Sequence, residues 1–294
     1  MRKIIAVGDS FQIYYPQQNQ KIKNKLILVE KIMYENLYYR RNELLMQNDK
    51  QKRLAEIFRD TQQFYTTNPV LRTAVENSRK GTVLYNPGDV PKLPKNPSKD
   101  GVVTVTKSRT FEAAIRIAKQ YPGKRIAVLN FASATNPGGG VINGSSAQEE
   151  SLCRCSTLYP ILNQNFLWQN YYNVNRSAGN SIHTDACIYS PNIVICKTDM
   201  DFPERIPPEK WVTVDVISCA APNLRRKPAN RYNPEHGQTV HITSDELQKI
   251  HEQRAKSIFL LPSPMVLTFL YWAHLAAVRS AMTQRSWQKH IRMY

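Results

Sequence analysis

Residues 126–150 read IAVLNFASATNPGGGVINGSSAQEE and contain the features that decide the fold. The stretch opens with a short apolar run, Ile126–Phe131, of the kind that forms a strand buried on both faces of a mixed or parallel sheet. A loop of small residues with three consecutive glycines, Gly138–Gly140, follows, and a helix is predicted from about Ala147. Ligands of open α/β sheets bind at the carboxyl ends of strands, so this loop is the predicted ligand edge.

The alternation of strand and helix continues on both sides of this stretch. Residues 102–106 are rich in β-branched side chains, and Thr110 is predicted to cap an amphipathic helix that follows them. Residues 212–217 are predicted to form another strand. Thr243 and Glu246 have the spacing of a capping box and predict the start of a last helix. Strands that alternate with helices indicate an α/β fold.

The residues after the first strand suit a substrate that joins a diphosphate to a sugar. The backbone N–H groups of Gly138–Gly140 can approach a phosphate closely. A carboxyl of Glu149 or Glu150 can move protons at a glycosidic bond. Each part also has a simpler explanation, because a glycine run is often a flexible turn and acidic residues complement a helix dipole. Their combination after a buried strand favours the nucleotide–sugar site.

The spacing of Gly-Gly-Gly, seven residues and Gln-Glu-Glu resembles the signature of poly(ADP-ribose) glycohydrolases. Residues 129–137, with Tyr189–Pro191 and Ala221–Asn223, resemble the microbial-type branch of that family, and the resemblance covers about residues 33–259. It implies a macrodomain, which is a three-layer α/β/α fold with a mixed sheet that binds ADP-ribose. The helical spacing of apolar residues within 30–80 separately predicts an N-terminal helical accessory region.

The resemblance further implies an activity, the hydrolysis of the O-glycosidic ribose–ribose bond in poly(ADP-ribose) with release of ADP-ribose. By motif position Glu150 is the catalytic general acid/base, and Glu149 is the second catalytic residue, which orients the distal ribose. The implied substrate-binding residues are Asn136 at the distal ribose, Gly138, Gly139, Gly140 and Val141 along the ribose-diphosphate, and Gln148. Neither a cofactor nor a metal is expected. The alternative is a non-catalytic module that binds ADP-ribose, which the fold alone does not distinguish.

Four segments are predicted along the chain. Residues 1–32 share no pattern with the rest of the chain and are interpreted as an extra N-terminal segment, with Met33 as a candidate functional start. Residues 33–101 are the helical accessory region, which ends in a Pro-rich loop. Residues 102–259 are the macrodomain-like catalytic core, and residues 260–294 are an aberrant apolar and basic tail.

The tail has two competing interpretations. Ile258–Val278 holds no Asp, Glu, Lys or Arg, so its length alone allows a membrane anchor. The favoured interpretation is a frameshift after about Phe259, because the family continues into a last strand and a second glycine-rich phosphate loop. Methionine and tryptophan each have one codon, so reading one base earlier forces glycine at residues 265–266 and at 272–273. One allowed reading contains the missing loop. The chain as written is then expected to lack a strand of the sheet and to be unstable and weak as an enzyme.

Charge and cysteine content constrain the partners. The net charge of +17 suggests an anionic partner, although residues 1–29 and 260–294 carry much of it. The remainder fits either a solvated basic surface or an anion-binding cleft. The expected partner is ADP-ribose or poly(ADP-ribose) on modified proteins, with no specific nucleic acid and no membrane, and the chain is expected to be a monomer. Five cysteines, an odd number, suit reduced thiols in the cytoplasm.

Two further groups have a chemical and a plainer interpretation. Cys153 and Cys155 have a spacing compatible with a metal site, but no other Cys/His pair completes a zinc pattern, so core or surface thiols are favoured. His183 and Asp185 are compatible with a catalytic pair, but an ordinary loop pair is favoured.

Overall fold

The computed structural model describes residues 4–7, 10–13, 45–89, 106–225, 240–261 and 269–271. The chain divides into two compact units, Met1–Lys50 and Gln51–Tyr294. In the first unit, β1 (Ile4–Val7) and β2 (Ser10–Ile13) form an antiparallel pair.

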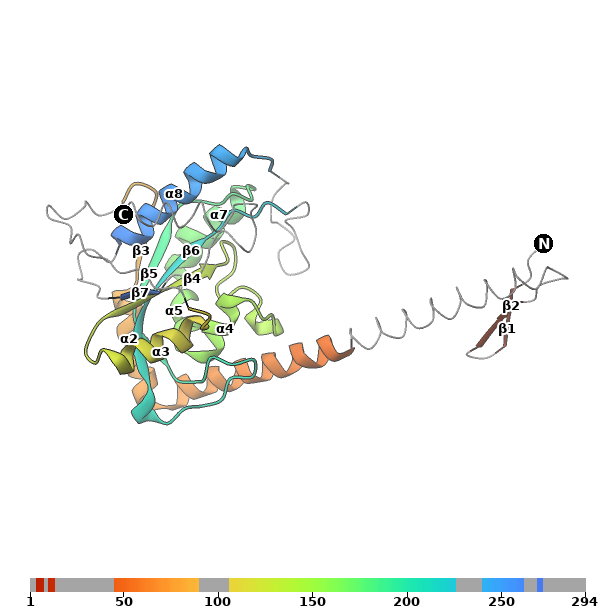
Figure 1. The fold of residues 1–294 in the computed structure, drawn as a ribbon, viewed down its shortest axis with the longest axis horizontal. Helices are drawn as coiled ribbons and strands as arrows, with labels where there is room; N and C mark the ends of the chain where they lie inside the picture. Colours follow the sequence, from red (N-terminus) through yellow and green to blue (C-terminus); the bar gives the residue numbers. More distant parts are fainter. Residues whose placement is uncertain are drawn as a thin grey trace. The chain divides into compact units, whose positions relative to one another are not determined.

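A five-stranded mixed sheet forms the centre of the second unit (Figure 1). Its order is β3 (Val83–Tyr85), β5 (Cys187–Ile195), β6 (Val212–Ala220), β4 (Ile126–Ala132) and β7 (Phe269–Tyr271). The first three strands pair antiparallel, whereas β6, β4 and β7 run parallel. The carboxyl ends of β4 and β6 therefore meet at one edge, as expected of a mixed sheet with a ligand edge.

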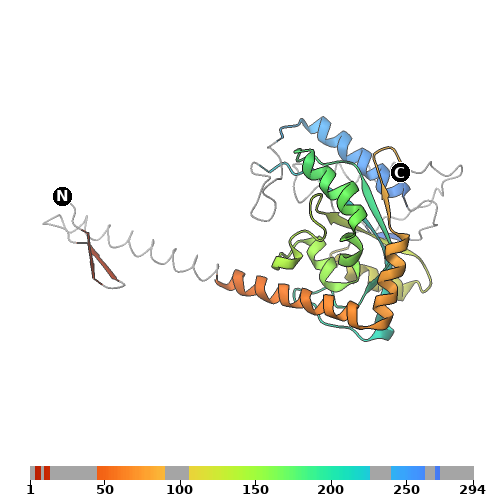
Figure 2. The same ribbon diagram turned by 180° about the vertical axis from the view of Figure 1, so that it is seen from behind.

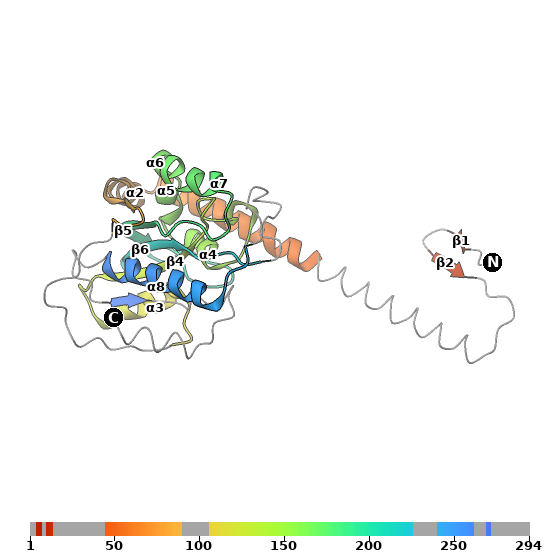
Figure 3. The ribbon, with the colours of Figure 1, turned by 90° about the horizontal axis from the view of Figure 1, so that it is seen from above.

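Helices cover both faces of this sheet. The helices of this unit are residues 51–67 of a helix that begins at residue 45, α2 (Pro69–Gly81), α3 (Thr110–Gln120), α4 (Gln148–Cys155), α5 (Leu158–Leu162), α6 (Asn165–Leu167), α7 (Asn173–Ser177) and α8 (Ser244–Leu260). Three short turns accompany them: η1 (Val141–Asn143), η2 (Trp168–Tyr172) and η3 (Pro208–Lys210). Figure 3 shows α8 on one side of the strands and α2 and α5 on the other. The three-layer α/β/α expectation is confirmed.

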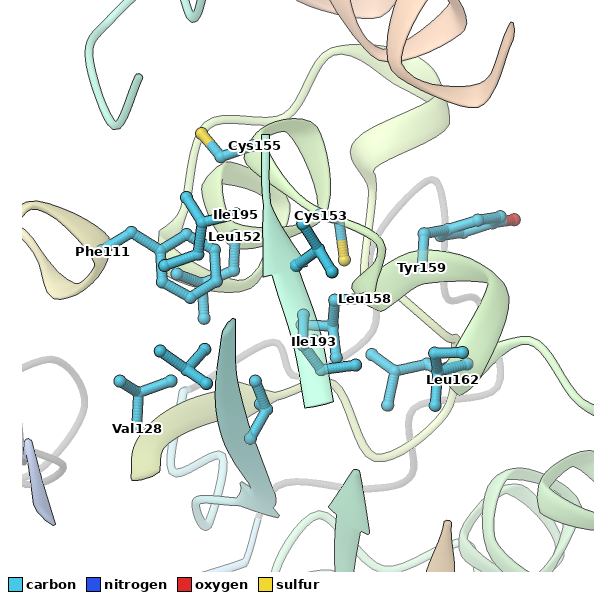
Figure 4. Close-up of a cluster of buried hydrophobic side chains, with 14 of the residues drawn as sticks. Phe111, Val128, Leu152, Cys153, Cys155, Leu158, Tyr159, Leu162, Ile193 and Ile195 are labelled. Carbon is cyan, nitrogen blue, oxygen red and sulfur yellow. The ribbon is translucent and has the colours of Figure 1, made fainter. Parts of the chain in front are cut away.

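The apolar strand β4 is buried on both faces because its side chains alternate between two core clusters. Ala127 and Leu129 pack in a cluster with Ile258 of α8. Ile126 and Val128 pack in the larger cluster on the opposite face. Figure 4 shows part of that larger cluster, in which the side chain of Leu152 from α4 lies close to the strands. Helix α4 is therefore anchored by apolar packing directly behind the glycine loop.

The N-terminal helices of the second unit belong to the same packed body as the sheet (Figure 2). Thr61 Oγ1 donates a hydrogen bond to the carbonyl of Arg154 at 2.7 Å, which joins the first helix to the end of α4. Lys197 Nζ is buried and reaches both the Ile57 carbonyl at 3.0 Å and Asp60 Oδ2 at 2.7 Å. The accessory helices thus support the segment that carries the paired glutamates.

Several sequence predictions differ from the structure in detail. Thr110 is the first residue of α3 rather than its cap. Arg109 is the N-cap residue, and its N–H donates to Glu112 Oε2 at 3.0 Å. Strand β5 was not predicted, because Pro191 and Asn192 interrupt its sequence pattern; Asn192 has a φ of 56° at a bulge.

Other sequence predictions fall partly on residues that the structure does not describe. The expected Pro-rich loop over 83–101 begins with the strand β3, and its residues 90–101 lie outside the described residues. Four residues of the expected strand at 102–106, residues 102–105, also lie outside them. The altered tail was expected to leave the sheet without a strand. That prediction is wrong for the edge next to β4, where β7 pairs in parallel with Ile126–Val128. Residues 262–268 and 272–294 are not described, so the frameshift stays a prediction.

Substituting alanine for Gly144 is expected to lower the free energy of unfolding by about 2–4 kcal/mol. Gly144 has a φ of +76°, and a Cβ there would lie 1.9 Å from the Gln51 carbonyl oxygen. Gly179 is a matched control, since its φ is +57° but a Cβ would meet nothing within 4 Å. Gly179→Ala should cost only about 1 kcal/mol for the backbone. The free energies of unfolding are measured by urea denaturation. If both variants lose the same amount, the close packing of the Gly144 loop against the helix at Gln51 is wrong.

Candidate functional site

The first carboxyl of the site, that of Glu149, is buried and hydrogen bonded at the end of β4. Its side chain is 3% exposed. Oε2 accepts the Ser133 N–H at 2.7 Å, and Oε1 accepts from Asn130 Nδ2 at 3.3 Å. Asn130 also donates to Ser218 Oγ on β6 at 3.0 Å, so it links the two parallel strands under this carboxyl. The carboxyl of Glu149 is therefore fixed by the sheet edge itself.

The second carboxyl, that of Glu150, is held by the glycine loop. Its side chain is 8% exposed, and Oε1 accepts the Gly140 N–H at 2.9 Å. Oε2 has no hydrogen bond among the described residues. Glu149 and Glu150 are adjacent in the first turn of α4, and both carboxyls lie against Gly139. Of the two, Glu150 is the more accessible and has an oxygen left for a ligand.

The glycine loop approaches these carboxyls so closely that side chains would not fit. Gly138 and Gly139 have φ values of +66° and +57°, in the region that favours glycine. A Cβ on Gly139 would lie 2.6 Å from Glu150 Oε1 and 3.3 Å from Glu149 Oε2. A Cβ on Gly140 would meet Ser145 Oγ at 2.3 Å. The glycines are thus required for contact with the protein's own acidic pair, which adds to the role predicted for them at a ligand.

The backbone N–H groups of this loop are used inside the protein. Gly139 donates to the Asn136 carbonyl at 3.1 Å, Gly140 donates to Glu150, and Val141 donates to the Gly138 carbonyl at 3.1 Å. In this structure the loop therefore shapes the carboxyl site. The predicted contacts of Gly138, Gly139, Gly140 and Val141 with a diphosphate stay predictions.

Gln148 fastens α4 to the strand. Its Oε1 accepts the Phe131 N–H at 2.8 Å, while Nε2 donates to the Leu129 carbonyl at 2.7 Å and to Thr110 Oγ1 at 3.1 Å. Both the oxygen and the nitrogen of the Gln148 side-chain amide are therefore hydrogen bonded to other residues of the protein. Its predicted contact with substrate stays a prediction, and the structure shows a positioning role.

Asn136 lies in the same loop and is held by two neighbours. Its backbone N–H donates to Ser133 Oγ at 3.1 Å, and its Oδ1 accepts from Arg176 Nη2. Asn136, the glycines and the acidic pair thus share one continuous loop-and-helix unit, as the motif predicted. Whether Asn136 touches the distal ribose stays a prediction.

Four residues of this site were missed by sequence reasoning: Asn130, Ser133, Arg154 and Arg176. Asn130 had a usable signal, since it is a polar residue inside an apolar strand and is fully buried. Arg154, also buried, follows Glu150 by one helical turn and donates to the Ser145 carbonyl. Arg176 comes from a distant helix and had no local signal.

The two carboxyls lie side by side, and this raises the pKa of Glu149. Burial has the largest effect, and the neighbouring Glu150 carboxyl adds to it. Together they raise the pKa of Glu149 to about 8, even though the Ser133, Asn130 and Gly138 hydrogen bonds favour the charged form. The carboxyl of Glu149 therefore holds its proton more tightly than an exposed glutamate does. Such a pair can hold and deliver a proton next to a sugar.

Substituting glutamine for Glu149 is expected to flatten the pH dependence of stability. The folded carboxyl binds its proton more tightly than the unfolded one, whose pKa is near 4.5. Its stabilising contribution is complete below pH 4.5 and is lost as the pH rises toward 8, at about 1.4 kcal/mol per pH unit at most. Urea midpoints of the wild type should fall relative to Glu149→Gln over this window. Glu76→Gln, an exposed change on α2, is the control, and parallel curves for wild type and Glu149→Gln would contradict the shift.

The other candidate residues have packing roles. Cys153 and Cys155 are buried among apolar side chains of the larger core cluster, which matches the core-thiol interpretation (Figure 4). Asp185 accepts from Arg254 Nε at 2.8 Å, and the His183 carbonyl accepts from Arg254 Nη2 at 3.1 Å. The His183–Asp185 segment is thus tied to α8 as a loop. Within the described ranges, no helix is long and apolar enough to cross a membrane.

A macrodomain-type glycosidase hydrolase is the class that this fold and site define: two buried carboxyls lie against a glycine loop at the carboxyl edge of parallel strands, inside three α/β/α layers.

Comparisons with known proteins agree with this class. The family described as "Microbial-type PARG, catalytic domain" matches residues 58–198. The poly(ADP-ribose) glycohydrolase of Thermomonospora curvata is 27% identical, with a TM-score of 0.58 over 74% of this chain and 77% of that chain. The enzyme from Deinococcus radiodurans, solved in complex with ADP-ribose, is 30% identical, with a TM-score of 0.51 over 67% of this chain and 73% of that chain. A search of curated proteins found no match. The chain belongs to the microbial-type poly(ADP-ribose) glycohydrolase family.

Proposed function

We propose that the chain hydrolyses the O-glycosidic ribose–ribose bond of poly(ADP-ribose) and releases ADP-ribose, with Glu150 as the general acid/base. The single observation that supports this most is the Gly140 hydrogen bond to Glu150 Oε1, which leaves Oε2 for a ligand at the carboxyl edge of the sheet. The solved Deinococcus radiodurans relative is bound to ADP-ribose, and a Thermomonospora curvata structure is bound to the inhibitor ADP-HPD.

In the proposed mechanism Glu150 acts twice. Its carboxylic acid gives a proton to the oxygen that leaves as the ribose–ribose bond breaks. The resulting carboxylate then takes a proton from a water that attacks the anomeric carbon, so that the acid is restored. Glu149 lies beside it and orients the distal ribose, and the glycine loop keeps both carboxyls in place.

A direct assay distinguishes the enzyme from the alternative binding module. The chain is incubated with poly(ADP-ribose), free ADP-ribose is measured by chromatography, and ADP-ribose affinity is measured by calorimetry. Release of ADP-ribose supports the proposed function. Binding without release supports a non-catalytic module, and neither binding nor release overturns both.

We also propose a monomer that acts in the cytoplasm on ADP-ribosylated proteins. Cys153, Cys155, Cys187, Cys196 and Cys219 are all free thiols, which suits a reducing compartment. The altered tail over 260–294 is expected to weaken this chain. Size-exclusion chromatography with light scattering tests the monomer, and sequencing the DNA across codons 255–270 tests the frameshift.

A further inference from the structure

Arg154 ties the segment before α4 to the end of the same helix. Its buried side chain donates from Nη1 to the Ser145 carbonyl at 2.5 Å. The N-cap residue of α4 is Ala147, whose side chain has no polar atom to cap the helix. The carbonyl of Arg154 accepts from Thr61 Oγ1 at 2.7 Å, on the first helix of the unit. Arg154 therefore fixes the chain that leads from the glycine loop into α4.

Hydrogen bonds close a ring that begins and ends on α4. Arg154 donates to the Ser145 carbonyl, and the Ser145 N–H donates to the Gly140 carbonyl at 3.2 Å. The Gly140 N–H donates to Glu150 Oε1 at 2.9 Å. Glu150 and Arg154 are four positions apart on α4, a spacing that makes side chains neighbours on one face of a helix. The ring thus joins the Glu150 carboxyl to the Arg154 guanidinium through the glycine loop.

Ser145 lies directly against Gly140, so the position of one residue sets the position of the other. A Cβ on Gly140 would lie 2.3 Å from Ser145 Oγ and 3.0 Å from Ser145 Cβ. If the hydrogen bond from Arg154 were lost, Ser145 would be free to move away from α4. The Gly140 N–H would move with it, and the Glu150 carboxyl would lose its backbone partner.

Arg154 differs from the other two buried lysine and arginine side chains among the described residues. Lys197 lies 2.7 Å from Asp60 Oδ2, and Arg254 lies 2.8 Å from Asp185 Oδ1. In the described part of the chain, Arg154 has no carboxylate within ion-pair distance, and its Nε is buried without a hydrogen bond. A buried N–H without a partner is unfavourable. A residue that is kept at a cost in stability is typical of a functional site.

The charge of Arg154 lies near acidic groups of α4 and of the segment after β5. Burial lowers the pKa of the Arg154 guanidinium, and nearby groups oppose this effect, namely Cys155, Glu150, Cys153 and Asp199. An arginine keeps its proton even so. When Glu150 gives up its proton, its carboxylate is therefore formed near a fixed positive charge.

We propose that Arg154 is a positioning residue that holds the glycine loop in the arrangement in which Gly140 fixes the Glu150 carboxyl. Its effect on the rate rests on the proposed function, since that effect requires release of ADP-ribose. Its effect on the loop requires no activity. Loss of Arg154 should therefore loosen the loop, and it should slow the reaction more than it weakens ADP-ribose binding.

The first measurement is hydrogen exchange of the full chain, read by mass spectrometry of a peptide that spans residues 138–146. In Arg154→Met the amides of this peptide should exchange about tenfold faster, the size expected from one lost hydrogen bond. Residues 126–129 of β4 are the internal reference. Arg79→Met is the matched control, since Arg79 also lies in the last turn of a helix and donates to a backbone carbonyl, that of Pro160 at 3.2 Å. It should leave the exchange of this peptide unchanged.

The second measurement is the rate of ADP-ribose release together with the dissociation constant of ADP-ribose. Arg154→Met should lower kcat about a hundredfold, the loss expected when a reacting group is displaced by about 1 Å. The dissociation constant should change much less. Arg154→Lys should recover part of the rate and of the protection from exchange, because lysine keeps the charge and a donor but not the fork of donors. If Arg154 served stability alone, the rates would follow the folded fraction, which urea denaturation measures.

Each outcome separates this assignment from the proposed function. Unchanged exchange of residues 138–146 in Arg154→Met overturns the assignment, and so does faster exchange with an unchanged rate. If the unaltered chain releases no ADP-ribose, the proposed function fails, and the exchange rates still decide whether Arg154 holds the loop. If the methionine variant does not fold, Arg154→Lys takes its place, and exchange and rate equal to those of the unaltered chain then overturn the assignment.

Discussion

Glu150→Gln is expected to lower the rate of ADP-ribose release by about a thousandfold while ADP-ribose still binds. Glutamine has nearly the same shape, and its amide oxygen can keep accepting the Gly140 N–H that now binds Oε1 at 2.9 Å. It cannot donate a proton to a leaving oxygen or accept one from water. The loss should therefore appear in the rate and not in the affinity, as measured by chromatography of released ADP-ribose and by calorimetry.

A matched control for this change is Glu246→Gln. Glu246 also lies in the first turn of a helix and also accepts a backbone N–H, that of Thr243 at 2.7 Å, but it belongs to α8 on the other face of the sheet. It should leave the rate unchanged. If Glu150→Gln retains activity, or loses affinity for ADP-ribose together with activity, the assignment of Glu150 as acid/base is wrong.

The convergence of the two glutamates on the glycine loop was predictable because it is local in the sequence. The buried strand β4, the glycines and the first turn of α4 all lie within residues 126–150. The hydrophobic pattern predicts the strand and the helix, and the two carboxyls at the start of that helix both lie against Gly139. Gly138 and Gly139 of the same run have positive φ values.

Other features of the site depend on pairing across the fold, which no local pattern encodes. Gln148 engages the backbone of β4, so its role depends on how α4 lies against the strand. Asn130 reaches Ser218 only because β4 and β6 are paired in register. Strand β5 was missed because Pro191 breaks the alternation that marks a strand, although a bulge accommodates it in the sheet.

Gly139→Ala is expected to weaken both ADP-ribose binding and ADP-ribose release by at least about a hundredfold, because two costs coincide at one residue. The backbone φ of +57° is unfavourable for alanine, and the new methyl would lie 2.6 Å from Glu150 Oε1 and 3.2 Å from its carboxyl carbon. The carboxyl of Glu150 would have to move, and with it the hydrogen bond from Gly140. Unlike Glu150→Gln, this change should alter affinity as well as rate.

Gly123→Ala is the control that separates the backbone cost of a positive φ from the collision with the Glu150 carboxyl. Gly123 has a φ of +76°, but a Cβ there would meet nothing within 4 Å. It should lower stability by about 1 kcal/mol and leave binding and rate unchanged. Comparing the two variants at a temperature where both are folded isolates the collision with the acidic pair. Normal binding by Gly139→Ala would mean that the glycine loop does not set the position of Glu150, and the geometry on which the proposed mechanism depends would be wrong.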